Sequence, residues 1–494
     1  MSYTLLAVLL LPILAVPFTY LVGRKSAKYA AILLAIIILA TLGLILTTVP
    51  TILNSGKVTE FYAWIPALNT QFTLSIDGIS ISMEIVTMVL MLTAAIYSIN
   101  YMEGKKNLQV YYALLSLLFV GLVGVFITSN LLFFYFCWEL MLVPAYFIIG
   151  GWGYRDSYKA AFKFFVFTHA GAVFVLLGIG AIYMTTGTTD IVAAQTALIS
   201  FPEIAKWILL ALTAGFAVKM AIVPVHMWLP DAHGEAPTPL SAILSGVIIS
   251  AGAYAILRLS LGMVFPAIAN TAFGVDFLHG LAIFGVLSAF FGGFIALVET
   301  DIKRIIAYSS MSHMGYILFG LSLFPVEVAI VGTVLHIVAH AFSKGLLFFS
   351  AGAVMHSLHI RNIKEMGGLA GRMPFSATFS TIAALSLGGA PPFACFISEF
   401  FIFVGAFQLM ATDNFFAILT ASMLIATVLS LGYSLRFVST VFLGPSKLPD
   451  EKKKLEVPKY MLVAMALMAI IVVILGVYPS FFIELIQTAI SSLI

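Results

Sequence analysis

The sequence predicts an all-α polytopic membrane protein, and three observations lead to this fold class. Hydrophobic residues make up 62% of the chain and charged residues only 9%, whereas a soluble domain carries roughly 25% charged residues. Apolar runs that could cross a ~30 Å hydrocarbon core as helices recur from one end of the chain to the other. Basic residues gather in alternate connections between these runs. We therefore expect the bilayer to be the solvent of this chain.

Hydropathy divides the chain into about fourteen predicted spans. The connections between them are short, so we expect a single membrane domain over residues 1–494 without a separate soluble or nucleotide-binding domain. The first apolar run lacks a basic leader and a clear cleavage site, which favours a retained helix over a signal peptide. The spans are expected at 3–22, 29–49, 81–99, 110–127, 131–151, 161–184, 207–223, 240–257, 278–298, 305–323, 326–355, 375–408, 415–438 and 460–483.

Charges in the connections predict the orientation. Loops after odd-numbered spans hold roughly 17 Lys and Arg residues, including Lys452, Lys453 and Lys454, against about two after even-numbered spans. Because Lys and Arg concentrate on the cytoplasmic side, we expect a multi-pass protein of the cell membrane with both termini facing away from the cytoplasm. The net charge of +3 is scattered between apolar runs, which argues against a nucleic-acid partner, since that needs a basic patch.

Three ionisable residues stand out inside predicted spans. Each costs about 2.5–3.5 kcal/mol at the centre of a membrane helix, so it normally faces a partner or a water-filled path. Glu139 lies in FYFCWELMLVPAYF, with no other charge for several turns. Lys219 is followed five residues later by Pro224, which interrupts a helix. Glu399 follows the proline-containing break GGAPPF.

Two proline-interrupted helices in corresponding places of two halves point to an ion or substrate site near the bilayer midplane. Hydrocarbon disfavours the charged form of a lysine, and a nearby carboxylate restores it. We therefore expect Glu139 to modulate Lys219, which passes a proton towards Glu399. The alternative is that these charges form static buried ion pairs that hold helices in register.

A row of basic side chains extends this path along one predicted helix. His336, His340 and Lys344 recur every four residues and so share one face. A histidine has an unperturbed pKa near 6.5 and can relay protons in the physiological range. The His pair could instead bind a metal, but no carboxylate or third histidine is near in sequence, so no metal is expected; hydrogen bonding across helices is a further alternative. Three other histidines give weaker signals and are expected to cap or bridge helix ends: His169, His226 and His313.

The segment KMAIVPVHMWLPDAHGEAPTP, from Lys219 onwards, resembles the signature of the antiporter-like subunits of proton-pumping NADH:quinone oxidoreductase, complex I. FTLSIDGIS, WELMLVP and DIKRIIAYSSMSHMG agree with the same family. The resemblance implies about fourteen transmembrane helices with two inverted five-helix repeats, at residues 110–260 and 278–438, each containing a broken helix. It also assigns the channel glutamate to Glu139, the broken-helix lysine to Lys219 and the distal-channel residue to Glu399.

Two positions refine the resemblance. A glutamate rather than a lysine at Glu399 favours the branch called chain M or chain 4. Ser250 stands where many members carry a lysine, so the middle of the proton path is short of one relay, for which His336 or water would have to substitute.

The resemblance implies a proton-translocating subunit that holds no cofactor itself. Flavin and iron–sulfur clusters would belong to a peripheral redox arm, a quinone-type carrier would accept the electrons, and sister antiporter-like subunits would be neighbours in the membrane. Related assemblies that use deazaflavin, ferredoxin or hydrogenase modules employ nearly the same subunit. The alternatives are a stand-alone or Mrp-type sodium/proton antiporter and a purely structural membrane subunit.

Overall fold

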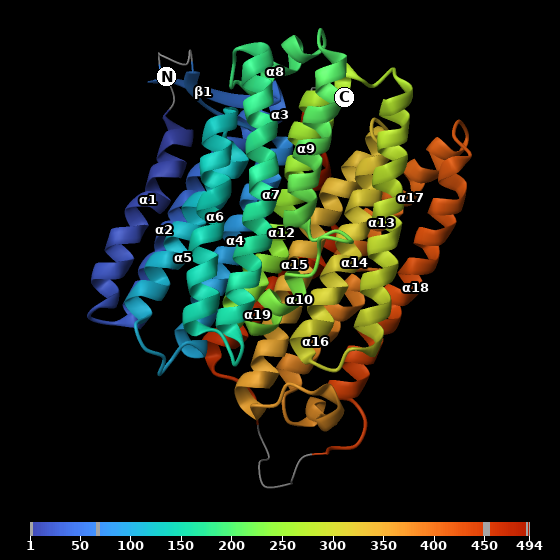
Figure 1. Ribbon diagram of the computed structural model, residues 1–494. Coiled ribbons are helices and arrows are strands. Elements are labelled where there is room, and N and C mark those ends of the chain that lie inside the picture. Colours follow the sequence, from blue (N-terminus) through green and yellow to red (C-terminus); the bar gives the residue numbers. More distant parts are fainter. Residues whose placement is uncertain (1–2, 66–69, 448–454, 491–492, 494) are drawn as a thin grey trace.

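The structure is a computed structural model that describes residues 3–65, 70–447, 455–490 and 493. This part of the chain forms a bundle of helices that run side by side along one direction (Figure 1). The first half contains α1 (Thr4–Gly23), α2 (Ala27–Leu46), α3 (Val49–Ser55), α4 (Gly78–Tyr101), α5 (Leu108–Ile127), α6 (Leu131–Trp152), α7 (Ser157–Thr186), α8 (Ile191–Leu198), α9 (Pro202–Met220), α10 (Leu229–Glu235), α11 (Thr238–Ile243), η2 (Leu244–Ile248), α12 (Ile249–Ala255), η3 (Ile256–Val264) and η4 (Phe265–Ala267). The second half contains α13 (Ala272–Val298), α14 (Ile302–Ser322), α15 (Glu327–Leu358), η5 (Ile363–Glu365), η6 (Leu369–Gly371), α16 (Pro374–Leu387), α17 (Ala394–Met410), α18 (Phe415–Phe442), α19 (Lys459–Val477) and α20 (Ser480–Ile490).

Eleven helices in the described part are long and apolar enough to cross a membrane. This confirms a polytopic helical membrane protein. It does not establish the predicted number of fourteen spans. The predicted span 375–408 is divided into α16 and α17, and the last predicted span is divided into α19 and α20. Residues 238–267 form one continuous helical span in which the π-helical segments η2 and η3 flank α12.

A β-hairpin precedes α4, and here the purely helical prediction was wrong. β1 (Lys57–Ile65) pairs antiparallel with β2 (Thr70–Asp77), with Val58 opposite Ile76. β-branched and aromatic residues, which favour strands, are frequent in this segment. Asp77 ends the hairpin and caps α4, because its carboxylate accepts hydrogen bonds from the backbone N–H groups of Ile79 and Ser80 at 3.1 and 3.0 Å.

Both helix interruptions predicted from prolines are present. α9 ends at Met220, and the following Ala221 adopts a left-handed conformation with φ of 58°. Regular helix resumes only with α10. In the second half, the chain between α16 and α17 is not helical, and it contains the prolines of GGAPPF. At each interruption, backbone N–H and C=O groups lack helical hydrogen-bond partners. A buried ionisable residue, Lys219 or Glu399, lies close in sequence to each interruption.

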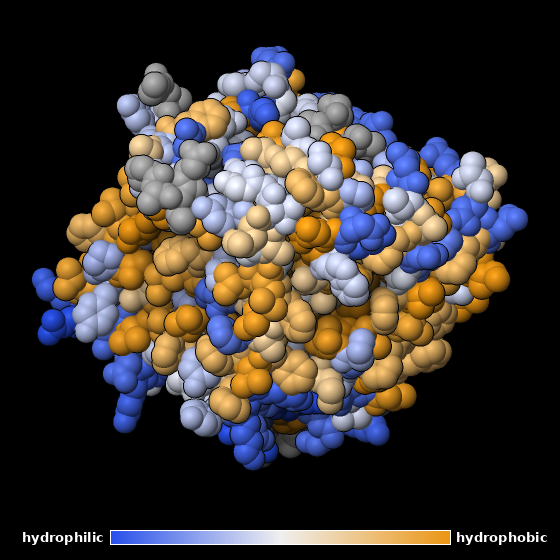
Figure 2. Space-filling model, turned by 45° about the horizontal axis from the view of Figure 1, so that its top comes forward, coloured by the Kyte–Doolittle hydropathy of each residue, from blue (hydrophilic) through white to orange (hydrophobic). Residues whose placement is uncertain are grey.

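The surface is apolar where a bilayer would surround it. Figure 2 shows hydrophobic side chains across the middle of the visible face and hydrophilic ones mainly towards its ends. Exposed side chains on this apolar surface include Leu177, Ile418 and Val428. By contrast, the most apolar windows of the 238–267 span and of α15 are completely buried, so these two central elements can carry polar residues away from lipid.

The two chain ends lie at one end of the bundle (Figure 1). The connections α1–α2, α4–α5 and α6–α7, which hold predicted cytoplasmic charges, lie at the opposite end. Lys452, Lys453 and Lys454, which also belong to this prediction, lie outside the described residues.

Candidate functional site

Glu139 lies on α6 and interacts with a histidine of the neighbouring helix α7. Its Oε2 atom is 3.2 Å from Nδ1 of His169, while Oε1 is buried and has no hydrogen-bond partner in the described part of the chain. His169 therefore bridges two helices, as one of its predicted roles states, but it does so within α6 and α7 rather than at a helix end.

Lys219 occupies the last turn of α9 and is only 2% exposed. Its amine lies 4.9 Å from the ring centroid of Trp138, the residue before Glu139. The charge is favoured by this aromatic face and by the carbonyl groups at the helix C-terminus. Among the described residues, Lys219 forms no ion pair within 4.0 Å, so a static pair between Glu139 and Lys219 is not the arrangement that the chain adopts.

The polar row on α15 is completely buried and contacts two other helices. Nδ1 of His336 is 2.9 Å from the Ser398 hydroxyl of α17, and its Nε2 is 3.2 Å from Nδ1 of His313 on α14. Lys344 donates a hydrogen bond to the Ser309 hydroxyl. Both ring nitrogens of His340 are buried and have no hydrogen-bond partner among the described residues. His313, for which only a bridging role was predicted, is therefore a member of the central cluster.

Glu399 lies on α17 next to this cluster and is 6% exposed. Its Oε1 atom is buried, and no described residue forms a hydrogen bond with it. The break before α17 turns over the carboxylate at Gly389, where φ is +68° and an added Cβ would lie 2.7 Å from Oε2. A residue with a Cβ would be strained at this φ, and the Glu399 carboxylate would have to move to make room for it.

One ligand atom from each of His313, His336 and Glu399 lies within 4.8 Å of the other two. Two histidines and a carboxylate are a donor set that zinc accepts. No carboxylate or third histidine is near His336 in sequence, but Glu399 and His313 from other helices lie beside it in space. The ring nitrogens of the two histidines already contact each other and Ser398, an arrangement that also suits proton transfer along hydrogen bonds.

Glu84 on α4 is a buried charge that the sequence analysis missed. It is fully buried, and neither carboxylate oxygen has a hydrogen-bond partner within residues 3–65, 70–447, 455–490 and 493. The signal was available, since Glu84 lies within the predicted span 81–99 and meets the criterion that selected Glu139.

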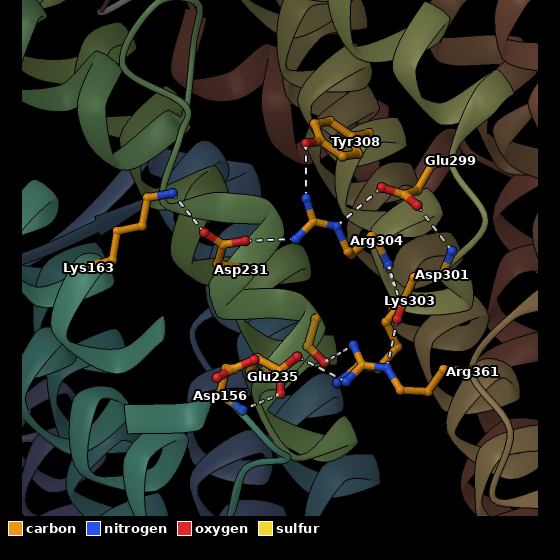
Figure 3. Close-up of polar contacts among 11 residues, drawn as sticks. Asp156, Lys163, Asp231, Glu235, Glu299, Asp301, Lys303, Arg304, Tyr308 and Arg361 are labelled. Atoms are coloured by element: carbon orange, nitrogen blue, oxygen red, sulfur yellow. Dashed lines mark hydrogen bonds and ion pairs between the residues drawn. The ribbon is translucent and has the colours of Figure 1, made fainter. Parts of the chain in front are cut away.

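An ion-pair network ties the segment after the first broken helix to the second half of the chain (Figure 3). Its members come from α7, α10, the connection before α14, α14 itself and the connection after α15. The pairs are Lys163–Asp231 at 2.7 Å, Arg304–Asp231 at 2.7 Å, Arg304–Glu299 at 3.2 Å, Arg361–Glu235 at 2.9 Å and Arg361–Asp301 at 2.6 Å. The motifs LPDAHGE and DIKR thus meet in space, and their charges fix α10 against α14.

The network favours the charged form of the Glu299 carboxyl group. Partial burial raises its pKa, but hydrogen bonds from the backbone N–H groups of Thr300 and Asp301 and from Arg304 outweigh burial, so the pKa is lowered overall. The ion pairs of the network therefore act as a structural tie between α10 and α14.

Comparison with protein families assigns the chain. The family described as NADH:quinone oxidoreductase/Mrp antiporter, transmembrane, matches residues 128–429. The chain belongs to this family. A second family, described as NADH-ubiquinone oxidoreductase (complex I), chain 5 N-terminus, matches residues 64–112. The matched regions include Glu84, Glu139, Lys219 and Glu399.

Individual relatives agree with the branch that Glu399 suggested. NADH-quinone oxidoreductase subunit M of Pseudomonas aeruginosa is 34% identical over 84% of this chain and 81% of the relative. The subunit of the same name from Rickettsia prowazekii is 31% identical over 98% of this chain and 97% of the relative. The predicted resemblance to complex I chain M is confirmed.

Two solved structures share the fold. A chain of the Mrp complex from Dietzia sp. DQ12-45-1b has a TM-score of 0.88 at 24% identity, and the match covers 99% of this chain and 52% of that one. This chain thus spans about half of the Mrp chain. A chain of respiratory complex I from Thermus thermophilus has a TM-score of 0.85 at 23% identity, and the match covers 99% of this chain and 98% of that one.

Proposed function

We propose that this chain is a proton-translocating membrane subunit of a redox-driven complex of the NADH:quinone oxidoreductase type. The observation that carries the proposal is the placement of buried ionisable groups at both helix interruptions. Lys219 lies at the end of α9, and Glu399 lies just after the break that precedes α17. Charges in lipid are costly, and proton relays are a common reason to keep them.

The proton path in this proposal runs from Glu139 and Lys219 to Glu399 through the polar row on α15. Glu139, beside His169, changes the electrostatic potential at Lys219 without bonding to it. Protons released by Lys219 move along Lys344, His340 and His336. His336 is close to Glu399, which delivers the proton to the far side.

We also propose the two inverted repeats, at residues 110–260 and 278–438. Each contains one interrupted element, α9 followed by α10 in the first and α16 followed by α17 in the second. The chain would act as a non-redox subunit in the cell membrane, with its termini on the non-cytoplasmic side. Sister antiporter-like subunits would flank it, and flavin and iron–sulfur clusters would lie in a peripheral arm that reduces a quinone-type acceptor.

The test is proton uptake by inside-out membrane vesicles that contain the intact complex, with quinone reduction measured in parallel. Glu139→Gln and Lys219→Met are expected to assemble and to lower proton uptake per electron by about tenfold or more, since each removes a proton-transfer group. Lys206→Met is the matched control, because Lys206 lies on the same helix and pairs only with Glu203 in the described structure. Normal pumping by both site variants would contradict the proposal.

A second candidate function is an Mrp-type sodium/proton antiporter subunit, which the fold shared with the Mrp chain favours. Sodium-driven proton movement in vesicles without an electron donor would distinguish it, since a redox-driven subunit is expected to be inactive there.

A further inference from the structure

Glu84 is the buried acidic group that the proposed path leaves unused. It lies less than two turns from the start of α4, with a relative exposure of 0%. A purely structural buried carboxyl group normally has hydrogen-bond partners. Neither oxygen of Glu84 has one among the described residues.

Contacts between α4 and the 238–267 span fix what lies at the level of Glu84. The Ser80 hydroxyl is 3.0 Å from the Tyr254 hydroxyl, and Thr238 bonds to Tyr101 at 3.0 Å near the other end of α4. The two elements therefore run antiparallel. Glu84 lies one turn after Ser80, and Ser250 lies one turn before Tyr254, so both face the same contact at the same level.

The third helix at this level is α15, which runs parallel to α4. The Leu90 side chain fills the space beside both Gly246 and Gly345, and the Tyr97 hydroxyl donates to the Phe349 carbonyl at 2.8 Å. Because the two helices are parallel and Leu90 lies beside Gly345, the residues of α15 at the level of Glu84 precede Gly345, in the direction of His340. Glu84, Ser250 and His340 thus share one level of three packed elements.

All three side chains at this level are fully buried and have no hydrogen-bond partner in the part of the chain that the structure describes. The unsatisfied atoms are both oxygens of Glu84, the hydroxyl of Ser250 and both ring nitrogens of His340. We propose that Glu84 is an additional proton-transfer residue, which binds a proton between Ser250 and His340 and releases it again within the membrane. This inference rests on the proposed function and supplies an acidic relay beside Ser250, in the middle of the path.

A cavity of about 200 Å³ lies at the end of the bundle that carries the hairpin, one helical turn along α4 from Glu84. Ser80, Tyr254, Asp77 and Arg258 line it. Asp77 and Arg258 form an ion pair there, and Arg258 also reaches the Ser80 hydroxyl at 3.3 Å. Since Ser80 is one turn from Glu84, protons would exchange with this cavity through the Ser80 and Tyr254 hydroxyls.

The test uses the intact complex in inside-out vesicles and compares Glu84→Gln with Thr87→Val. Gln has nearly the shape of Glu and forms hydrogen bonds but does not titrate. Thr87 is an equally buried polar residue of α4, and among the described residues its hydroxyl bonds only to the Met83 carbonyl of its own helix. We expect Glu84→Gln to lower proton uptake per electron at least several-fold and Thr87→Val to leave it unchanged. Normal pumping by an assembled Glu84→Gln complex overturns the inference.

A second measurement covers the case in which Glu84→Gln does not assemble. A hydrophobic carbodiimide attacks protonated carboxylic acids in membranes, and peptide mass spectrometry of the wild-type complex locates the adduct. Modification of Glu84 that parallels loss of pumping supports the inference, whereas modification of Glu399 without Glu84 overturns it.

The variants also separate this inference from the proposed function. If Glu139→Gln and Lys219→Met abolish pumping but Glu84→Gln does not, the proposed function is supported and the proton-transfer role of Glu84 is contradicted. If only Glu84→Gln abolishes pumping, the proposed path through Glu139 and Lys219 is wrong, whereas the proton-transfer role of Glu84 is supported.

Discussion

Replacing Gly389 with alanine would measure how strongly the break before α17 positions Glu399. The residue has φ of +68°, and its Cβ would lie 2.7 Å from Oε2 of Glu399. A left-handed conformation costs a residue with a Cβ about 1–2 kcal/mol. In addition, the carboxylate would have to move by about 0.7 Å to reach an ordinary contact distance of 3.4 Å. A misplacement of about 1 Å can lower a rate about 100-fold, so we expect proton uptake per electron to fall by roughly tenfold.

Gly187→Ala is the matched control for this experiment. Gly187 has φ of +70°, and its Cβ would meet nothing within 4 Å, so this variant carries the conformational strain without the contact. Thermal denaturation of the solubilised complex should show a similar loss of about 1–2 kcal/mol for both variants, and only Gly389→Ala should lose coupling in vesicles. Equal coupling in the two variants would refute the idea that Gly389 positions the carboxylate.

The remaining predictions concern charged groups near the ends of the bundle. Arg304→Ala removes the pairs with Asp231 and Glu299, both partly exposed, and should destabilise the solubilised complex by about 1–2 kcal/mol; a midpoint of thermal denaturation equal to that of Lys206→Ala would contradict this. In the connection before α18, hydrogen bonds from His279 at 2.7 Å and from the backbone N–H of Phe415 at 2.9 Å lower the pKa of Asp413 from 3.8, against the opposing effect of burial. A lowered folded-state pKa means that the stabilisation is present above the unfolded value and is lost as pH falls through the folded value. Asp413→Asn should therefore lose part of the acid sensitivity in thermal denaturation between neutral pH and about pH 3, and an unchanged pH profile would argue against this contribution.

The membrane fold followed from the sequence because the cost of charge and of unpaired backbone groups in hydrocarbon acts on local segments. The same rule selected Glu139, Lys219 and Glu399, and prolines located both helix interruptions. The cost of a charge in lipid also applied to Glu84, which was overlooked. Strand-forming residues between Lys57 and Asp77 indicated the hairpin that the all-helical prediction excluded.

Spatial partners depended on packing between segments distant in the chain. The sequence predicted that Glu139 modulates Lys219, but it did not predict that His169 lies against Glu139 or that Trp138 lies beside Lys219. Likewise, His313 joins His336 and Glu399 from a different helix.

The sequence by itself therefore determined which side chains are too costly to bury without a purpose, because that cost depends on residue type and on the hydrophobicity of the surrounding segment. The tertiary structure alone decided which of them meet. Hydrogen bonds and proton transfer act over a few ångströms, and only the packing of α4, α14, α15 and α17 brings residues of separate helices within that range.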